Sequence, residues 1–97
     1  MPPVIFEDRD IVGSGHYLQE VRISTFPANQ DFPEGIRYSL CLVDRQTGEV
    51  VLLYDIHRGK SHHRHFRGEE LSYEFVDEDK LLEDFLREVD LIVEGKR

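Results

Sequence analysis

The residues best suited to chemistry in this chain are gathered in one short segment, residues 54–67. It holds four of the five histidines and four of the twelve lysines and arginines, and no Asp or Glu lies between Asp55 and Glu69. These side chains are His57, His62, His63 and His65, with Arg58, Lys60, Arg64 and Arg67. Imidazoles exchange protons near neutral pH, and guanidinium and ammonium groups bind anions. The segment therefore indicates a site for an anion, above all a phosphodiester.

The charge of this segment is opposite to that of its surroundings. The chain has a net charge of −8, with nine acids and four bases in residues 1–56 and eleven acids and four bases in residues 69–97. Residues 57–67 carry four bases and no acid. The overall charge argues against binding nucleic acid with the whole surface, but leaves one basic island for it. Alternatively, an acidic C-terminal helix neutralises the island through structural ion pairs.

Cleavage of RNA through its own 2′-hydroxyl is the first chemistry that fits these residue types. It needs a base near that hydroxyl, an acid near the departing oxygen and positive charge at the phosphate. If the segment is extended, His63 and His65 share one face while His62 and Arg64 share the other. We predict that His63 and His65 are the acid–base pair and that Arg64 and Lys60 contact the phosphate.

The remaining polar residues of the region are predicted to support this pair. They are His57 and His62 as further catalytic candidates, Arg58, Arg67 and Tyr73 as substrate-binding groups, and Asp55 as a carboxylate that orients an imidazole. Asp55 could instead cap the turn that follows its strand. Phe66, apolar among charges, is predicted to be a buried anchor.

Two other functions compete with catalysis. Asp55 and neutral imidazoles could bind zinc, but the spacing between His57 and His62 matches no common structural zinc site, and the neighbouring cations oppose a dication. We therefore predict no metal and no cofactor. The second alternative is a surface that binds RNA, or the acidic face of a protein, without chemistry.

Length and composition indicate how many domains the chain forms and in which compartment the protein works. The 97 residues, 39% of them hydrophobic, predict a single domain spanning residues 1–97. Cys41 is the only cysteine, which favours a reducing compartment. The sequence has no secretion signal and no apolar run of the roughly 18 residues that a membrane span needs. We expect a cytoplasmic protein, and a homodimer through an exposed strand edge is compatible with its size.

Alternating polar and apolar residues predict the strands that position the segment. The expected strands are residues 4–6, 16–26, 36–44, 50–55 and, less regularly, 71–75. The charged residues 8–10 are expected to end the first strand. Because Cys41 and Val43 are apolar on the second face of their strand, we expect that strand to be covered on both sides.

From Asp77 onward the apolar residues recur every three or four positions, which predicts a helix that Asp77 caps and Gly95 ends. Its acids are expected on a solvated face, with Asp84 as an exception. They are Glu83, Asp84, Glu88 and Asp90. The predicted fold is a two-layer α+β domain, a mostly antiparallel sheet of four to five strands packed against one long C-terminal helix.

The order of these motifs resembles the TumE family of small toxin-like proteins. The matching residues are Tyr54-Asp55-x-His57, Lys60-x-His62-His63-Arg64-His65, Tyr73-x-Phe75, Leu81-Leu82-Glu83-Asp84-Phe85 and, in the middle strand, Arg37-Tyr38-Ser39-Leu40. The resemblance covers about the last two-thirds of the chain. Ile56 and Ser61 depart from the pattern, at positions where more polar or smaller residues are expected.

The resemblance implies the toxin component of a toxin–antitoxin module, whose partner is a small cognate antitoxin that usually carries a DNA-binding domain. It points to a set of site residues: Asp55, His57, His62, His63, Arg64, His65, Tyr73 and Asp84. Asp84 enters the predicted site through this resemblance, as an orienting group. RNA as the target is not implied by the family. It follows from the residue chemistry and from analogy with other small toxins.

Overall fold

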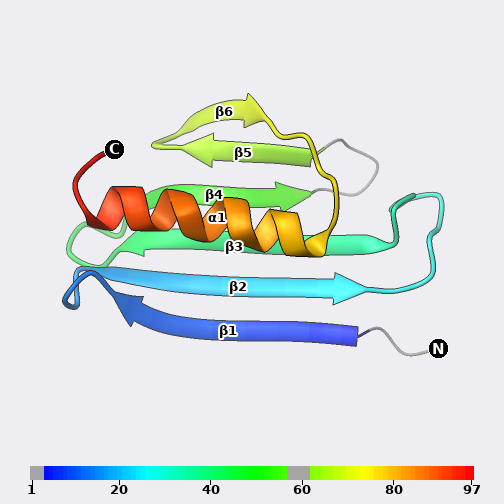
Figure 1. Cartoon of the computed structure of the whole chain (residues 1–97), viewed down its shortest axis with the longest axis horizontal. Helices are drawn as coiled ribbons and strands as arrows, with labels where there is room; N and C mark the ends of the chain where they lie inside the picture. The colour runs from blue at the N-terminus through cyan, green and yellow to red at the C-terminus, as the bar shows by residue number, and fades with distance from the viewer. Residues whose placement is uncertain (1–3, 57–61) are drawn as a thin grey trace.

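The computed structural model describes residues 4–56 and 62–97, which form a six-stranded antiparallel sheet and one helix (Figure 1). The elements are β1 (Val4–Val12), β2 (Tyr17–Thr25), β3 (Ile36–Asp44), β4 (Val50–Ile56), β5 (His62–Phe66), β6 (Glu69–Ser72) and α1 (Glu78–Val93). The strands lie side by side in chain order, and α1 crosses one face over β3 and β4 (Figure 1). No helix among these residues is long and apolar enough to span a membrane.

The α+β class is confirmed, but the expected four to five strands are corrected to six. Part of the histidine-rich segment is itself a strand, since β5 pairs with β4 on one side and with β6 on the other. The charged residues 8–10 do not end β1, which continues to Val12 in unbroken register with β2. Because β1 is an edge strand, its charged side chains stay in solvent and need no burial.

The hydrophobic core lies between the sheet and α1. Alternate residues of β3 and β4 point toward the helix, and the apolar stripe of α1 meets them. The most completely buried side chains are Leu40, Leu42, Val51, Leu52, Tyr54, Leu81 and Phe85. Asp77 caps α1 as predicted, with its carboxylate accepting a hydrogen bond from the Lys80 amide at 2.8 Å. Because the apolar face of α1 packs on the sheet, one face of the sheet is turned toward the helix and the core.

The opposite face, here called the open face, is covered by none of the helices or strands among the described residues. Cys41 and Val43 of β3 point to it and are only half-buried. The expectation that this strand is covered on both sides is therefore wrong. A single helix of 16 residues supplies only one apolar layer, so the second face stays available to ligands.

The connection between β2 and β3 is held by backbone contacts and needs glycine at its end. The Phe26 amide donates to the Gly35 carbonyl at 3.0 Å, and the Asn29 side chain accepts from the amides of Asp31 and Phe32. Gly35 has φ +69°, and a Cβ there would lie 2.4 Å from the carbonyl oxygen of Phe26. The backbone at Gly35 thus passes so close to the Phe26 carbonyl that only glycine fits there.

Gly35→Ala should lower the free energy of unfolding by about 3 kcal/mol, because the left-handed conformation and the displaced carbonyl both cost energy. Gly48→Ala is the matched control, since Gly48 has φ +78° but nothing within 4 Å of its would-be Cβ. That control should lose only about 1 kcal/mol. Urea unfolding measures both, and equal losses would show that the contact with Phe26 is irrelevant.

Candidate functional site

The pleat of β5 divides the histidine-rich segment between the two faces of the sheet. Successive side chains of a strand point to opposite sides. His62 and Arg64 contact groups on the helix side, whereas His63 and His65 lie on the open face. The structure thus brings His63 and His65 together and does not bring Arg64 to the same side. His57, Arg58 and Lys60 lie outside the described residues.

A row of polar side chains crosses all six strands on the open face. Residues that pair directly across strands share a face and lie about 5 Å apart. The pairings place in one line Glu7, Arg22, Ser39, Asp55, His63 and Ser72. This row therefore alternates acidic, basic and hydroxyl groups, in the order carboxylate, guanidinium, hydroxyl, carboxylate, imidazole and hydroxyl.

The two open-face imidazoles are close together and flanked by carboxylates. The ring centroids of His63 and His65 are 6.3 Å apart. The His65 Nε2 lies 3.7 Å from Asp55 Oδ1 and 3.9 Å from Glu70 Oε1, and the His63 Nε2 lies 4.0 Å from Glu70. These distances are longer than hydrogen bonds, as is common in ligand-free sites. The two imidazoles are thus close enough to contact one ligand, and the carboxylates of Asp55 and Glu70 lie next to them.

Asp55 is more deeply buried than the two imidazoles beside it. Asp55 is only 8% exposed, while the His63 and His65 side chains are 20% and 28% exposed. The Nδ1 of His63 is buried, and no group among the described residues forms a hydrogen bond with it. The imidazoles therefore reach the surface while the carboxylate stays beneath them.

His62, on the helix side, is held on both of its ring nitrogens. Its Nδ1 is 2.8 Å from the Tyr38 hydroxyl and its Nε2 is 2.6 Å from Glu34 Oε1. The ring also stacks on Phe75, with centroids 4.6 Å apart. Burial, with the nearby Tyr73, Asp55 and Glu34 groups adding to it, raises the pKa of Tyr38. His62 therefore joins β5 to its neighbours through Tyr38, Glu34 and Phe75.

Arg64 belongs to a buried ion-pair network with α1. Glu88, expected on a solvated face, is only 7% exposed, which corrects that expectation. Its carboxylate accepts hydrogen bonds from the Tyr54 hydroxyl, from Arg97 and from the Nε and Nη2 of Arg64, at 2.5 and 3.3 Å for Arg64. The hydrogen bond to Glu88 raises the pKa of Arg64. A buried carboxylate needs a cation as its partner, and the part-buried Arg64 supplies that charge to Glu88.

Two further charged residues of the predicted site, Arg67 and Asp84, are also paired. Arg67 lies 3.3 Å from Glu49, and the Tyr73 hydroxyl donates to Asp84 at 2.8 Å. Burial acts to raise the pKa of Asp84, but hydrogen bonds from Lys80 and Tyr73 outweigh it and hold the pKa below its usual value. Ion pairs with acids thus neutralise the helix side of the basic island, whereas its open-face imidazoles stay accessible.

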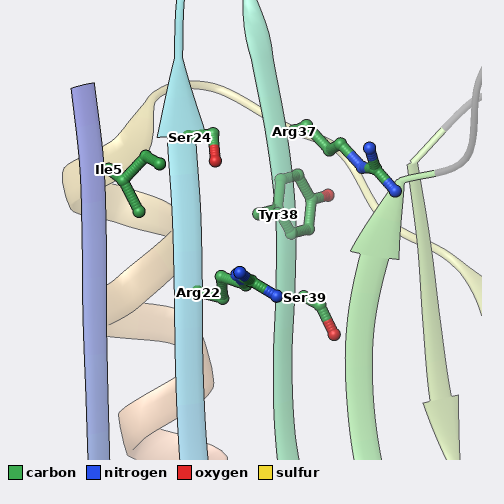
Figure 2. A pocket seen from close by; sticks show the side chains of 6 residues that line it. All are labelled: Ile5, Arg22, Ser24, Arg37, Tyr38 and Ser39. Atoms are coloured by element: carbon green, nitrogen blue, oxygen red, sulfur yellow. The ribbon is translucent and has the colours of Figure 1, made fainter. Parts of the chain in front are cut away.

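The structure adds a pocket that sequence reasoning missed. It has a volume of about 330 Å³ on the open face and is lined by side chains of β1, β2 and β3, including Arg22, Ser24, Arg37 and Ser39 (Figure 2). The alternating pattern of β2 already placed Arg22 and Ser24 on a polar face. Their meeting with Arg37 and Ser39 depends on strand register, which the sequence pattern leaves open.

Metal binding has no visible support in the part of the chain that the structure describes. No three His, Cys, Asp or Glu side chains of residues 4–56 and 62–97 converge as a metal ion would require. Zinc sites use three or four such ligands at short distances. The described histidines of the predicted site, His62, His63 and His65, are instead divided between the two faces of β5.

Comparison with known proteins gives one match. The model of a family described as Toxin TumE matches residues 4–93, from the start of β1 to the last residue of α1. The match includes the N-terminal third, to which the resemblance of motifs contributed little. No curated protein and no solved structure matches the chain.

Glu88→Ala should destabilise the protein by about 2 kcal/mol, because it leaves the part-buried Arg64 guanidinium and the buried Tyr54 hydroxyl without their shared partner. Glu83→Ala is the matched control on the same helix, since Glu83 only forms an exposed pair with Arg87. That loss should be below about 0.5 kcal/mol. Denaturant unfolding of both variants is the measurement, and similar values for the two would refute a structural role for the network.

Stability should fall above about pH 10, the ordinary pKa of tyrosine. Burial raises the pKa of Tyr38, Tyr54 and Tyr73, with Glu88 adding to it for Tyr54 and Asp84 for Tyr73. The unfolded chain therefore loses these protons first, and the stabilisation present below pH 10 is lost as pH rises. Urea unfolding at about pH 8 and about pH 11 measures this. Tyr73→Phe should reduce the difference, and an unchanged difference would contradict the assignment of Tyr73.

Proposed function

Because the chain belongs to the TumE family of toxins, we propose that it is a toxin that cleaves RNA without a metal ion, using His63 and His65 as the acid–base pair. The observation that carries this proposal is that the two imidazoles lie together on the open face, beside the buried carboxylate of Asp55. Membership of the family also implies an antitoxin as the partner protein.

The proposed reaction is an internal transfer at phosphorus. One imidazole, in its neutral form, takes the proton of the 2′-hydroxyl as that oxygen attacks the neighbouring phosphorus. The other imidazole, protonated, gives its proton to the departing 5′-oxygen as the bond from phosphorus to that oxygen breaks. The products are a 2′,3′-cyclic phosphate and a 5′-hydroxyl end, and the step leaves the first imidazole protonated and the second neutral. General acid–base catalysis of this kind contributes roughly 10²–10⁴-fold to a rate.

The distances support this division of labour. Each imidazole must lie within about 3 Å of its own oxygen. Rings with centroids 6.3 Å apart can flank one phosphate, each touching a different oxygen. Asp55, 3.7 Å from the His65 Nε2, is placed to orient that ring after a small rotation. It therefore acts as a positioning residue in the proposal, as do carboxylates behind catalytic histidines elsewhere.

Several predicted site residues take other roles in this proposal. His62, Arg64, Tyr73 and Asp84 hold β5 and β6 against α1 through the contacts described above. The expected phosphate contacts of Arg58 and Lys60, and a role for His57, stay predictions, since these residues lie outside the described ranges. Arg67 is exposed and paired with Glu49, at the far end of β5 from His62.

His63→Ala and His65→Ala should each lower RNA cleavage by at least about 100-fold while the fold is kept, because each removes one proton-transfer group. Wild type and variants are induced at equal levels in a bacterial host, with growth and total RNA followed over time. His16→Ala is the control, since His16 contacts Asp44 at 3.1 Å, outside the His63 and His65 pair.

The proposal is supported if the wild type and His16→Ala arrest growth and cleave RNA, and the variants at His63 and His65 do neither. Arrest without any change in RNA would keep the toxin and discard the ribonuclease. Full toxicity of both variants at His63 and His65 would favour the alternative, in which the same face binds RNA or a protein without chemistry.

A further inference from the structure

We propose that Arg22 and Arg37, with the hydroxyls of Ser24 and Ser39, form a second phosphate site on the open face. It would bind a phosphodiester next to the one at His63 and His65, on the same single strand of RNA. The inference rests on the proposed function only for the identity of the ligand as RNA. The four residues line the pocket of about 330 Å³ (Figure 2).

The four side chains occupy the corners of a small square made by two adjacent strands. Arg22 pairs with Ser39 across β2 and β3, and Ser24 pairs with Arg37. The Arg22 side chain reaches toward Ser39, whereas the Arg37 side chain extends from β3 away from Ser24 (Figure 2). The two arginines are diagonal neighbours, roughly 7–8 Å apart at their Cα atoms. Guanidinium forks and hydroxyls are the groups that bind phosphate oxygens in proteins.

The charges of this square are incompletely balanced by the protein. Arg37 is exposed and forms no ion pair or hydrogen bond with any residue of the described ranges. Arg22 contacts Glu7 through its Nε at 3.2 Å, but that pair is 71% and 55% exposed and contributes little. Both arginines line the same pocket, so an anion bound there would be attracted by both charges. The chain has net charge −8, so two arginines meeting in a hollow call for a specific anion.

The square is aligned with the proposed catalytic pair. The row that begins at Arg22 continues through Ser39 and Asp55 to His63. With strands about 4.8 Å apart, β3 lies roughly 10 Å from β5. One phosphate cannot span that distance to both groups, so the square would hold a neighbouring phosphate. A strand of RNA would then cross the sheet at a large angle to the β-strands, and the preferred substrate would be an oligonucleotide.

The pocket also offers an apolar wall. Ile5 of β1 lines it, pairs with Ser24, and is 54% exposed. An exposed apolar side chain beside a phosphate site can contact the face of a base without reading its hydrogen-bonding edge. The site would therefore add affinity without sequence preference.

The test is binding of a 2′-O-methyl uridine hexanucleotide, which cannot be cleaved because its 2′-oxygen is blocked. Fluorescence anisotropy gives Kd at several salt concentrations for the wild type and for Arg22→Gln/Arg37→Gln. The site would hold one phosphate, and each lost phosphate contact reduces the slope of log K against log salt by about 0.7, so the double variant should lose about 0.7. Its Kd should rise at least about tenfold at low salt.

The matched control is Arg9→Gln/Arg45→Gln, which removes the same charge from β1 and from the turn after β3. If both double variants lose the same affinity, the effect is one of net charge and the proposed site is wrong. Wild-type affinity in Arg22→Gln/Arg37→Gln would also overturn the site. Thermal unfolding confirms that all variants are folded. Because the probe is not cleaved, binding through the arginines without RNA cleavage would keep this site and discard the ribonuclease. Cleavage of RNA by the wild type, together with wild-type affinity of Arg22→Gln/Arg37→Gln for the probe, would keep the ribonuclease and discard this site.

Discussion

The carboxylate of Glu88 is the contact on which the arrangement of this protein depends. It joins three separate parts of the chain to α1, through Tyr54 of β4, Arg64 of β5 and Arg97 near the C-terminus. Because Arg64 is bound on the helix side, β5 cannot slip by one residue without carrying its cation to the wrong face. His63 and His65 are thereby directed to the open face. A structural ion pair on one side of a strand thus sets the chemistry on the other.

This division also explains how an acidic protein can present a site for an anion. The acids near the basic island lie mainly against its helix-side residues, where Glu34 meets His62, Glu49 meets Arg67 and Glu88 meets Arg64. Those pairs join neighbouring elements. On the open face the carboxylates near the imidazoles are Asp55 and Glu70, at distances that leave the rings accessible. Among the described residues, the acids thus pair with His62, Arg64 and Arg67, while the site proposed above uses the imidazoles of the open face.

A sheet with one covered face is well suited to a long, flexible ligand. The six strands form a continuous surface, and the row from Glu7 to Ser72 runs across it without interruption. Side chains on such a surface are held at fixed spacings by the hydrogen-bonded backbone, so a site can be extended one strand at a time. In the proposals made above, the imidazoles and the arginine square are two positions on that one surface.

The sequence by itself determined the α+β class, three of the long strands, the helix with its Asp77 cap and the alternation of His63 and His65 against His62 and Arg64. These follow from period-two and period-3.6 patterns, which are local properties of the chain. Only the tertiary structure decided the strand count, the burial of Glu88 and the meeting of Arg22 with Arg37 and Ser39. Such features depend on which strands pair and in which register, and pairing joins residues that are far apart in the sequence. Glu88 sits among other helix acids, so its burial could be known only once Arg64 was placed opposite.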